Sequence, residues 1–116
     1  MKIAAVGNST TWGFPYGPQA SWVRELQQQF PQVEWLNKGV NGDIFAGMRE
    51  RIADQVIGQS AAYCMVSGGL NDAATELSLP QIEKEIVAIC RMLREDSVTP
   101  VLIVPINTLV SHQGLQ

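Results

Sequence analysis

Short apolar runs alternate along this sequence with longer segments in which apolar residues recur at helical spacing. The apolar runs are rich in Val, Ile and Ala, as β-strands are, and each is followed closely by Gly or Asn. They predict four strands, at residues 2–6, 33–36, 61–66 and 101–106. The segments between these strands predict three long helices.

The first two helices are predicted from their apolar stripes and their end signals. Pro31 ends the first helix because proline cannot continue a helical hydrogen-bond ladder, and the stripe before it is Trp22, Val23, Leu26 and Phe30. Asp43 is predicted to open the second helix, since its carboxylate can accept hydrogen bonds from a free first turn, and Gly58 to end it. The stripe of this second helix is Phe45, Met48, Ile52 and Val56.

The third helix carries the strongest start signal. Ser78 and Gln81 have the spacing of a capping box, and Pro80 lies in the first turn, where proline is tolerated. Its apolar stripe is Ile82, Ile86, Ile89 and Leu93. The order of these elements is typical of βαβ units with right-handed crossovers. We therefore predict one α/β domain over residues 1–116, a flavodoxin-like three-layer sandwich with a parallel sheet in the order 2-1-3-4.

Composition narrows the function classes. The chain has 116 residues, of which 46% are hydrophobic and 16% charged, so it is not of the disordered type. A net charge of −3 gives no reason to expect a nucleic acid as partner, and no apolar run is long enough to span a membrane. The apolar start is too short for a signal peptide. We expect a cytoplasmic protein in which Cys64 and Cys90 are reduced core residues.

Three short polar motifs follow the first three predicted strands. Ser9 lies in the first motif, Gly42 in the second and Asn71 in the third. In a parallel sheet the carboxyl ends of strands one and three are neighbours at the switch point, where ligands bind. A serine hydroxyl, a glycine turn with positive φ and a carboxamide would then meet there, which is a nucleophile with hydrogen-bond donors for an oxyanion.

Each motif also has an ordinary structural interpretation. Ser9 suits a helix N-cap or a turn, Gly42 a turn before the helix capped by Asp43, and Asn71 an Asx-turn. The chemical interpretation depends on finding all three at equivalent strand ends.

The three motifs together resemble the first three blocks of the SGNH (GDSL-type) hydrolase family. They are Gly7-Asn8-Ser9 with Thr11 and Gly13, then Asn37-x-Gly39-x-x-Gly42-Asp43, and then Gly69-Leu70-Asn71-Asp72. The resemblance implies that Ser9 is the nucleophile, and that the N–H groups of Ser9 and Gly42 and the side chain of Asn71 form the oxyanion hole. It implies hydrolysis of small carboxylic esters or thioesters, without a metal or cofactor.

The sequence departs from the family pattern at two places. Asn8 stands where the first block usually has Asp, which keeps the hydrogen bonding and loses the charge. The family also takes its catalytic His and Asp from a D-x-x-H block after a fifth strand, and this sequence contains no D-x-x-H. His112 is the one candidate base, with Leu109 instead of a carboxylate three residues before it. We therefore expect the family's C-terminal strand and helix to be missing and its activity to be impaired.

The fourth predicted strand carries an expectation about partners. Its run from Val101 to Ile106 is continuously apolar, as in strands that are paired on both sides. At the edge of the sheet it would pair with another chain, because only Pro105 blunts it. We expect self-association, a domain swap or a lost C-terminal fragment.

Two other function classes fit parts of the sequence. A non-catalytic binding module on the same fold agrees with the missing base. A flavin or phosphate binder agrees with the hydroxyl-rich loop after the first strand, although that loop lacks a phosphate-binding glycine motif.

Overall fold

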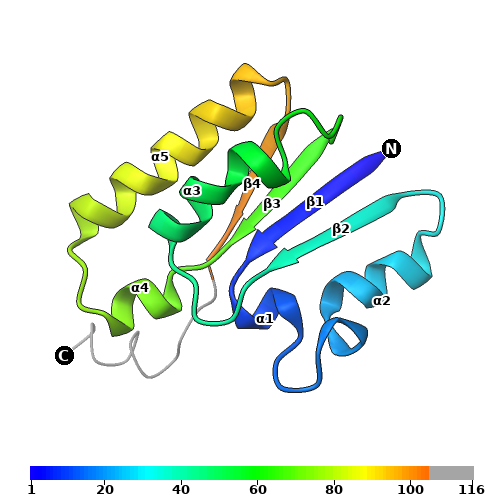
Figure 1. The fold of residues 1–116 in the computed structure, drawn as a ribbon, viewed down its shortest axis with the longest axis horizontal. Coiled ribbons are helices and arrows are strands. Elements are labelled where there is room, and N and C mark those ends of the chain that lie inside the picture. The colour runs from blue at the N-terminus through cyan, green and yellow to red at the C-terminus, as the bar shows by residue number, and fades with distance from the viewer. Residues whose placement is uncertain (105–116) are drawn as a thin grey trace.

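The computed structural model describes residues 1–104. Four strands form one parallel sheet: β1 (Lys2–Gly7), β2 (Glu34–Gly39), β3 (Tyr63–Ser67) and β4 (Thr99–Ile103). Their order is β2-β1-β3-β4 (Figure 1). The predicted α/β class, the parallel pairing and the strand order are all confirmed.

Helices surround the sheet, and the three long ones are those that the sequence predicts. They are α2 (Trp22–Gln29), α3 (Phe45–Gln55) and α5 (Leu79–Glu95). The capping box of α5 is confirmed, because Gln81 N–H donates to Ser78 Oγ and Ser78 N–H donates to Gln81 Oε1. The structure adds three short elements that the sequence did not predict: α1 (Ser9–Trp12), the 3₁₀ turn η1 (Pro18–Ala20) and α4 (Leu70–Ala74).

The bounds of all four predicted strands need correction. β1 extends one residue further, to Gly7, and β3 runs over Tyr63–Ser67 instead of 61–66. β2 begins one residue later and ends at Gly39 instead of Leu36, because residues 37–39 continue the ladder beside residues 5–7 of β1. β4 begins at Thr99 and so contains Pro100, which was predicted to precede it. An edge strand tolerates proline, since one side of its backbone needs no ladder hydrogen bond. The predicted end of this strand at residues 105–106 lies outside the described residues.

Three helix predictions were also wrong in detail. Helix α3 ends at Gln55, with Val56 as its C-cap, and not at Gly58. Asp43 does not cap α3, which begins two residues later, at Phe45. The Phe45 N–H instead donates to Asp72 Oδ2 at 3.1 Å, so a carboxylate from another element serves the first turn. Phe30 is not part of the buried stripe of α2, because it is the C-cap and its side chain is 49% exposed.

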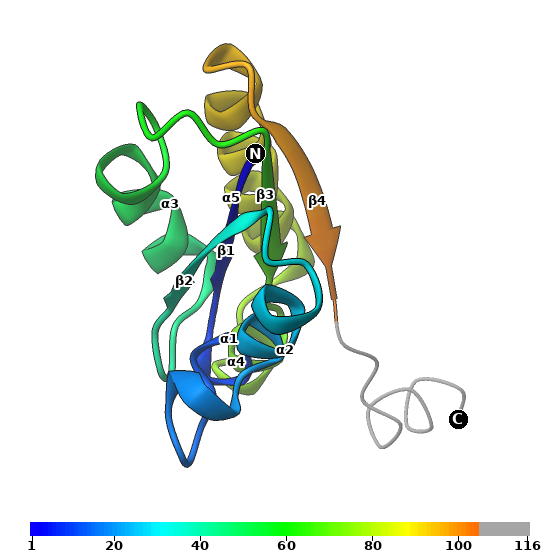
Figure 2. The ribbon, with the colours of Figure 1, turned by 90° about the vertical axis from the view of Figure 1, so that its right-hand side faces the viewer.

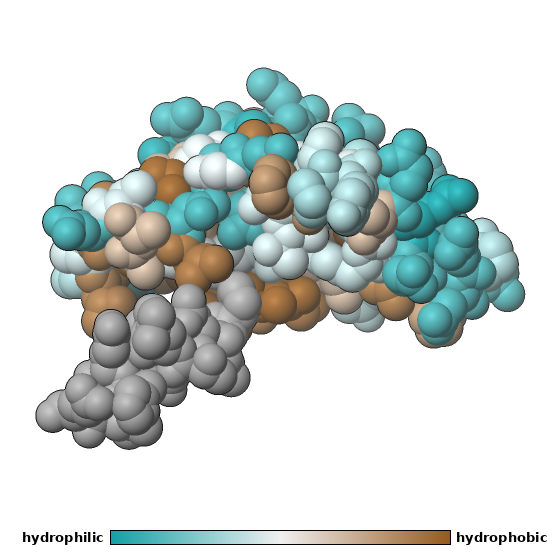
Figure 3. Space-filling model, turned by 90° about the horizontal axis from the view of Figure 1, so that it is seen from below, coloured by the Kyte–Doolittle hydropathy of each residue, from teal (hydrophilic) through white to brown (hydrophobic). Residues whose placement is uncertain are grey.

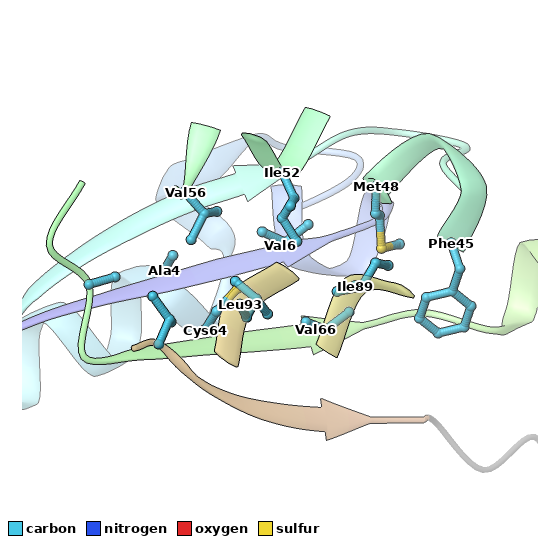
Figure 4. Packing of buried hydrophobic residues seen from close by; sticks show 12 residues of the cluster. Ala4, Val6, Phe45, Met48, Ile52, Val56, Cys64, Val66, Ile89 and Leu93 are labelled. Carbon is cyan, nitrogen blue, oxygen red and sulfur yellow. The ribbon is translucent and has the colours of Figure 1, made fainter. Parts of the chain in front are cut away.

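The core lies between one face of the sheet and helices α3 and α5 (Figure 4). Side chains alternate between the two faces of a strand, so the even-numbered core residues of β1 and β3 all point to this face. These residues are Ala4, Val6, Cys64 and Val66, and they pack against the stripes of the two helices. Burial raises the pKa of the Cys64 thiol to about 12, and both cysteines are free.

The opposite side of the sheet is less evenly covered. Helix α2 packs beside β2. Helix α5 packs against β4 from the core face, and no helix of the described residues covers the other face of β4 (Figure 2). Within residues 1–104 no helix has the length and apolar character needed to cross a membrane.

Candidate active site

The three polar motifs lie at the carboxyl edge of the sheet. Gly7 at the end of β1 is in register with Gly39 of β2 and with Ser67 of β3. Because the three strands end level with one another, α1, the β2–α3 loop and α4 all begin at the same edge (Figure 1). The sheet therefore brings the backbone segments of Ser9, Gly42 and Asn71 to one edge, as the sequence predicts.

Ser9 is the first residue of α1 and is half-buried. The residue before it, Asn8, is the N-cap, and its Oδ1 accepts a hydrogen bond from the Thr10 N–H at 3.1 Å. The amide thus supplies the capping oxygen that an aspartate would supply at this position. A helix leaves the N–H of its first residue without a partner inside the helix, so the Ser9 N–H is available as a donor.

Glycines let α1 approach the strands closely. A Cβ on Gly7 would lie 2.2 Å from Thr11 Oγ1, and a Cβ on Gly39 would lie 2.3 Å from the Trp12 nitrogen. The Asn37 side chain then fixes this contact. Its Nδ2 donates to the Thr11 carbonyl at 2.9 Å, and its Oδ1 accepts from the Gly39 N–H. The second motif therefore holds the element that carries Ser9.

Gly42 lies in the exposed loop between β2 and α3 with a φ of +79°. This left-handed conformation strains any other common residue, so the predicted positive-φ turn is confirmed. No atom lies within 4 Å of where a Cβ would stand. Conformation, and not crowding, is therefore what favours glycine here.

Asn71 is the second residue of α4, and its amide is held in place. The Nδ2 donates to the Asp43 carbonyl oxygen at 2.9 Å, next to Gly42 in the chain. A carboxamide nitrogen has two hydrogens, so this bond fixes the amide plane and leaves a second N–H to donate. The structure thus links the Asn71 and Gly42 motifs directly.

Two residues of this edge have roles that the sequence did not predict. Asp72 is 1% exposed and caps α3 from α4. Arg51 of α3 forms an ion pair with Asp43 and also contacts the ends of two strands. The sequence does carry a signal for Arg51, because it follows Met48 by three residues and so lies beside the buried stripe of its helix.

The sequence offers one candidate for the catalytic base. His112, the only histidine of the chain, lies outside the described residues. Within residues 1–104 no group of three or more His, Cys, Asp or Glu side chains is arranged to hold a metal ion.

Comparison with solved structures places the fold among hydrolases. A G-D-S-L family protein from Desulfitobacterium hafniense DCB-2 is 27% identical with a TM-score of 0.83, over 87% of this chain and 57% of that one. The SGNH-hydrolase family esterase AlinE4 is 23% identical with a TM-score of 0.80, over 87% and 57%. The esterase EstA from Pseudoalteromonas sp. is 15% identical with a TM-score of 0.82, over 92% and 62%.

The chain thus spans less than two thirds of the length of these three proteins. No curated protein matches it. The family model described as GDSL-like lipase/acylhydrolase matches residues 5–114, which is nearly the whole sequence. The match contains all three motifs of the carboxyl edge, and it shows that this chain belongs to the GDSL-like lipase/acylhydrolase family.

Proposed function

We propose that this chain carries the nucleophile and the oxyanion donors of a serine hydrolase that cleaves small carboxylic esters or thioesters. The observation that carries the proposal is the Asn71 amide, which is held by the Asp43 carbonyl beside Gly42 at the edge where Ser9 begins α1. Family membership supports an ester-cleaving reaction of the esterase type.

The proposed reaction has two halves. Ser9 Oγ attacks the carbonyl carbon of the ester and gives its proton to a base, and the carbonyl oxygen becomes an oxyanion. The Ser9 and Gly42 N–H groups and the Asn71 Nδ2 donate hydrogen bonds to that oxyanion. The bond to the alcohol or thiol then breaks, the leaving group takes the proton, and water hydrolyses the acyl-serine to release the acid.

The presence or absence of a base that activates Ser9 distinguishes this function from a second candidate function. A serine hydroxyl is a weak nucleophile without a base, and residues 1–104 contain no histidine. His112 or a histidine supplied by another chain would fill the role. Because the sequence contains no D-x-x-H block to supply such a base, the second candidate is a module that binds acyl esters in the same place without cleaving them.

Labelling with an alkylphosphonate probe tests the proposal. The probe forms a covalent bond to an activated serine, and intact mass together with peptide mapping locates it. We expect labelling at Ser9 and none after Ser9→Ala. Thr10→Ala is the matched control, because Thr10 is an exposed hydroxyl residue next in the chain. It should label like the wild type.

Hydrolysis of a short p-nitrophenyl ester completes the test. Ser9-dependent turnover that His112→Ala abolishes would assign the base to His112. Labelling of Ser9 that persists after His112→Ala would show that a group other than His112 activates the hydroxyl. A wild type that neither labels nor turns over, but binds the ester by calorimetry, would support the binding module and overturn the hydrolase.

A further inference from the structure

Arg51 occupies a central place beneath the carboxyl edge. Its side chain is 16% exposed, and its guanidinium lies against the ends of β1 and β2. Nη2 donates to the Gly7 carbonyl at 3.0 Å, and Nη1 donates to the Lys38 carbonyl at 2.7 Å and to Gln55 Oε1 at 2.6 Å. Nε and Nη2 both contact Asp43 Oδ2 at 2.9 Å. The guanidinium thus donates four hydrogen bonds, and its Nη2 also forms the ion pair with Asp43.

Asp43 lies in the motif of Gly42 and connects it to the motif of Asn71. Its Oδ1 accepts a hydrogen bond from the Ile44 N–H at 3.0 Å, and its backbone carbonyl accepts the bond from Asn71. The carboxylate fits only because residue 47 is glycine, since a Cβ there would lie 2.0 Å from Asp43 Oδ1. One guanidinium thus links the strand that leads to Ser9, the loop of Gly42 and, through Asp43, the amide of Asn71.

We propose that Arg51 is a positioning residue that sets the oxyanion donors at their working separation. The inference rests on the proposed function, because it assigns the network to acyl transfer. A guanidinium is planar and rigid, so its four hydrogen bonds and its ion pair fix the directions of the groups it joins as well as their distances. Displacing a reacting group by about 1 Å can lower a rate on the order of a hundredfold. Side chains that hold the oxyanion donors in place therefore affect the rate of acyl transfer.

The test compares two arginines of the same helix. Arg51→Gln removes the guanidinium, whose planar set of N–H donors is called the fork below. Arg51→Lys keeps the positive charge without the fork. Arg49→Gln is the matched control. Arg49 lies two residues earlier and pairs with Glu85 of α5, and no hydrogen bond joins it to Asp43 or to the strand ends. All variants are made in the full chain, and their thermal stability is recorded beside each rate.

The first measurement is the rate of phosphonate labelling at Ser9. We expect Arg51→Gln to lower this rate on the order of tenfold to a hundredfold, and Arg49→Gln to leave it unchanged. Arg51→Lys should recover only a small part, because an ammonium cannot reproduce the planar fork. If turnover is measurable, kcat should fall while KM stays near the wild-type value.

The second measurement does not need activity. In ¹H–¹⁵N spectra we expect Arg51→Gln to shift the Gly42 amide and the Asn71 side-chain amide, whereas Arg49→Gln shifts neither. Gly47→Ala provides an independent route to the same result. Alanine favours the helix over glycine but would push the Asp43 carboxylate away. The same two resonances should therefore move without loss of the fold.

These outcomes separate the inference from the proposed function. A wild type that is not labelled, together with Gly42 and Asn71 resonances that respond to Arg51→Gln and Gly47→Ala, would refute the hydrolase and keep the positioning network. Resonances that do not respond, or labelling rates that fall equally in the Arg51 and Arg49 variants, would overturn the role of Arg51. Full rescue by Arg51→Lys would overturn the role of the fork.

Discussion

The two edges of the sheet are built in opposite ways. At the β2 edge, the side chain of Gln27 on α2 serves the outer backbone of the strand. Its Nε2 donates to the Val33 carbonyl just before β2 at 3.0 Å, and its Oε1 accepts from the Trp35 N–H at 3.1 Å. A helix side chain therefore takes the place of a neighbouring strand there.

The β4 edge is apolar and open. Val101, Leu102 and Ile103 are 38%, 45% and 37% exposed, and Val104 just after the strand is 54% exposed. Among residues 1–104, the pairing partner of β4 is β3 alone. Seen from below, hydrophobic residues gather along the lower margin of the molecule, whereas its right-hand end is mostly hydrophilic (Figure 3).

A comparison of β4 with the central strand β1 shows that the hydrophobic content of a strand does not by itself decide how far the strand is buried. β1 and β4 are both apolar strands, yet Ala4, Ala5 and Val6 are at most 1% exposed. Position in the sheet order makes the difference, because β1 is paired on both sides. The predictions below use matched pairs of residues to test how far position determines the effect of a substitution.

The largest expected difference is between two isoleucines. Ile52→Ala removes a fully buried side chain of the core, whereas Ile103→Ala removes one that is 37% exposed on β4. We expect Ile52→Ala to lower the free energy of unfolding by about 2–5 kcal/mol, from lost burial and the cavity left behind. Ile103→Ala should cost less than about 1 kcal/mol. Urea denaturation measures both, and equal losses would mean that β4 is covered in solution.

The next prediction concerns the β2 edge. Gln27→Ala removes both hydrogen bonds to the strand, and we expect a loss of about 1–2 kcal/mol in the free energy of unfolding. Gln28→Ala is the control, because this neighbouring glutamine is exposed on the same helix. It should cost little. A Gln27 variant as stable as the Gln28 variant would show that the β2 edge does not need its helix.

Much of this fold was predictable from local patterns. The strand order and the capping box at Ser78 followed from signals that lie close together in the chain. The placement of the Ser9, Gly42 and Asn71 motifs at one edge followed from the rule that parallel strands end together. These features need no knowledge of long-range side-chain contacts.

The features that the sequence did not reveal depend on partners far apart in the chain. Asp43 looked like a cap for the helix that follows it, but its carboxylate is held by Arg51, and Asp72 serves that helix instead. The end of β2 looked like a loop because its residues are polar, yet pairing with β1 extends the strand. Tertiary contacts override local preference where a charged or amide side chain has several acceptors within reach.

A third prediction separates conformation from function with two glycines. Gly42 and Gly58 have φ values of +79° and +80°, and a Cβ at either would contact nothing within 4 Å. Alanine at each position should therefore cost about 1 kcal/mol of stability, from backbone strain alone. Gly42→Ala should also lower the rate of phosphonate labelling at Ser9, and Gly58→Ala should not. Equal labelling rates would remove the Gly42 N–H from the proposed oxyanion hole.

The smallest change in stability is expected at the β4 edge, where the effect should instead appear in association. Val101→Lys places a charge on an exposed apolar strand in register with Met65 of β3. The free energy of unfolding should change by less than about 0.5 kcal/mol, as is usual for surface substitutions.

Sedimentation velocity should show concentration-dependent association of the wild type and loss of that association in the Val101→Lys variant, because a lysine on an edge strand blocks edge-to-edge pairing. Val87→Lys is the control, since that valine is 39% exposed and lies on helix α5 instead of on the edge strand. A wild type that stays monomeric at every concentration, or a Val87 variant that dissociates equally well, would contradict pairing through β4.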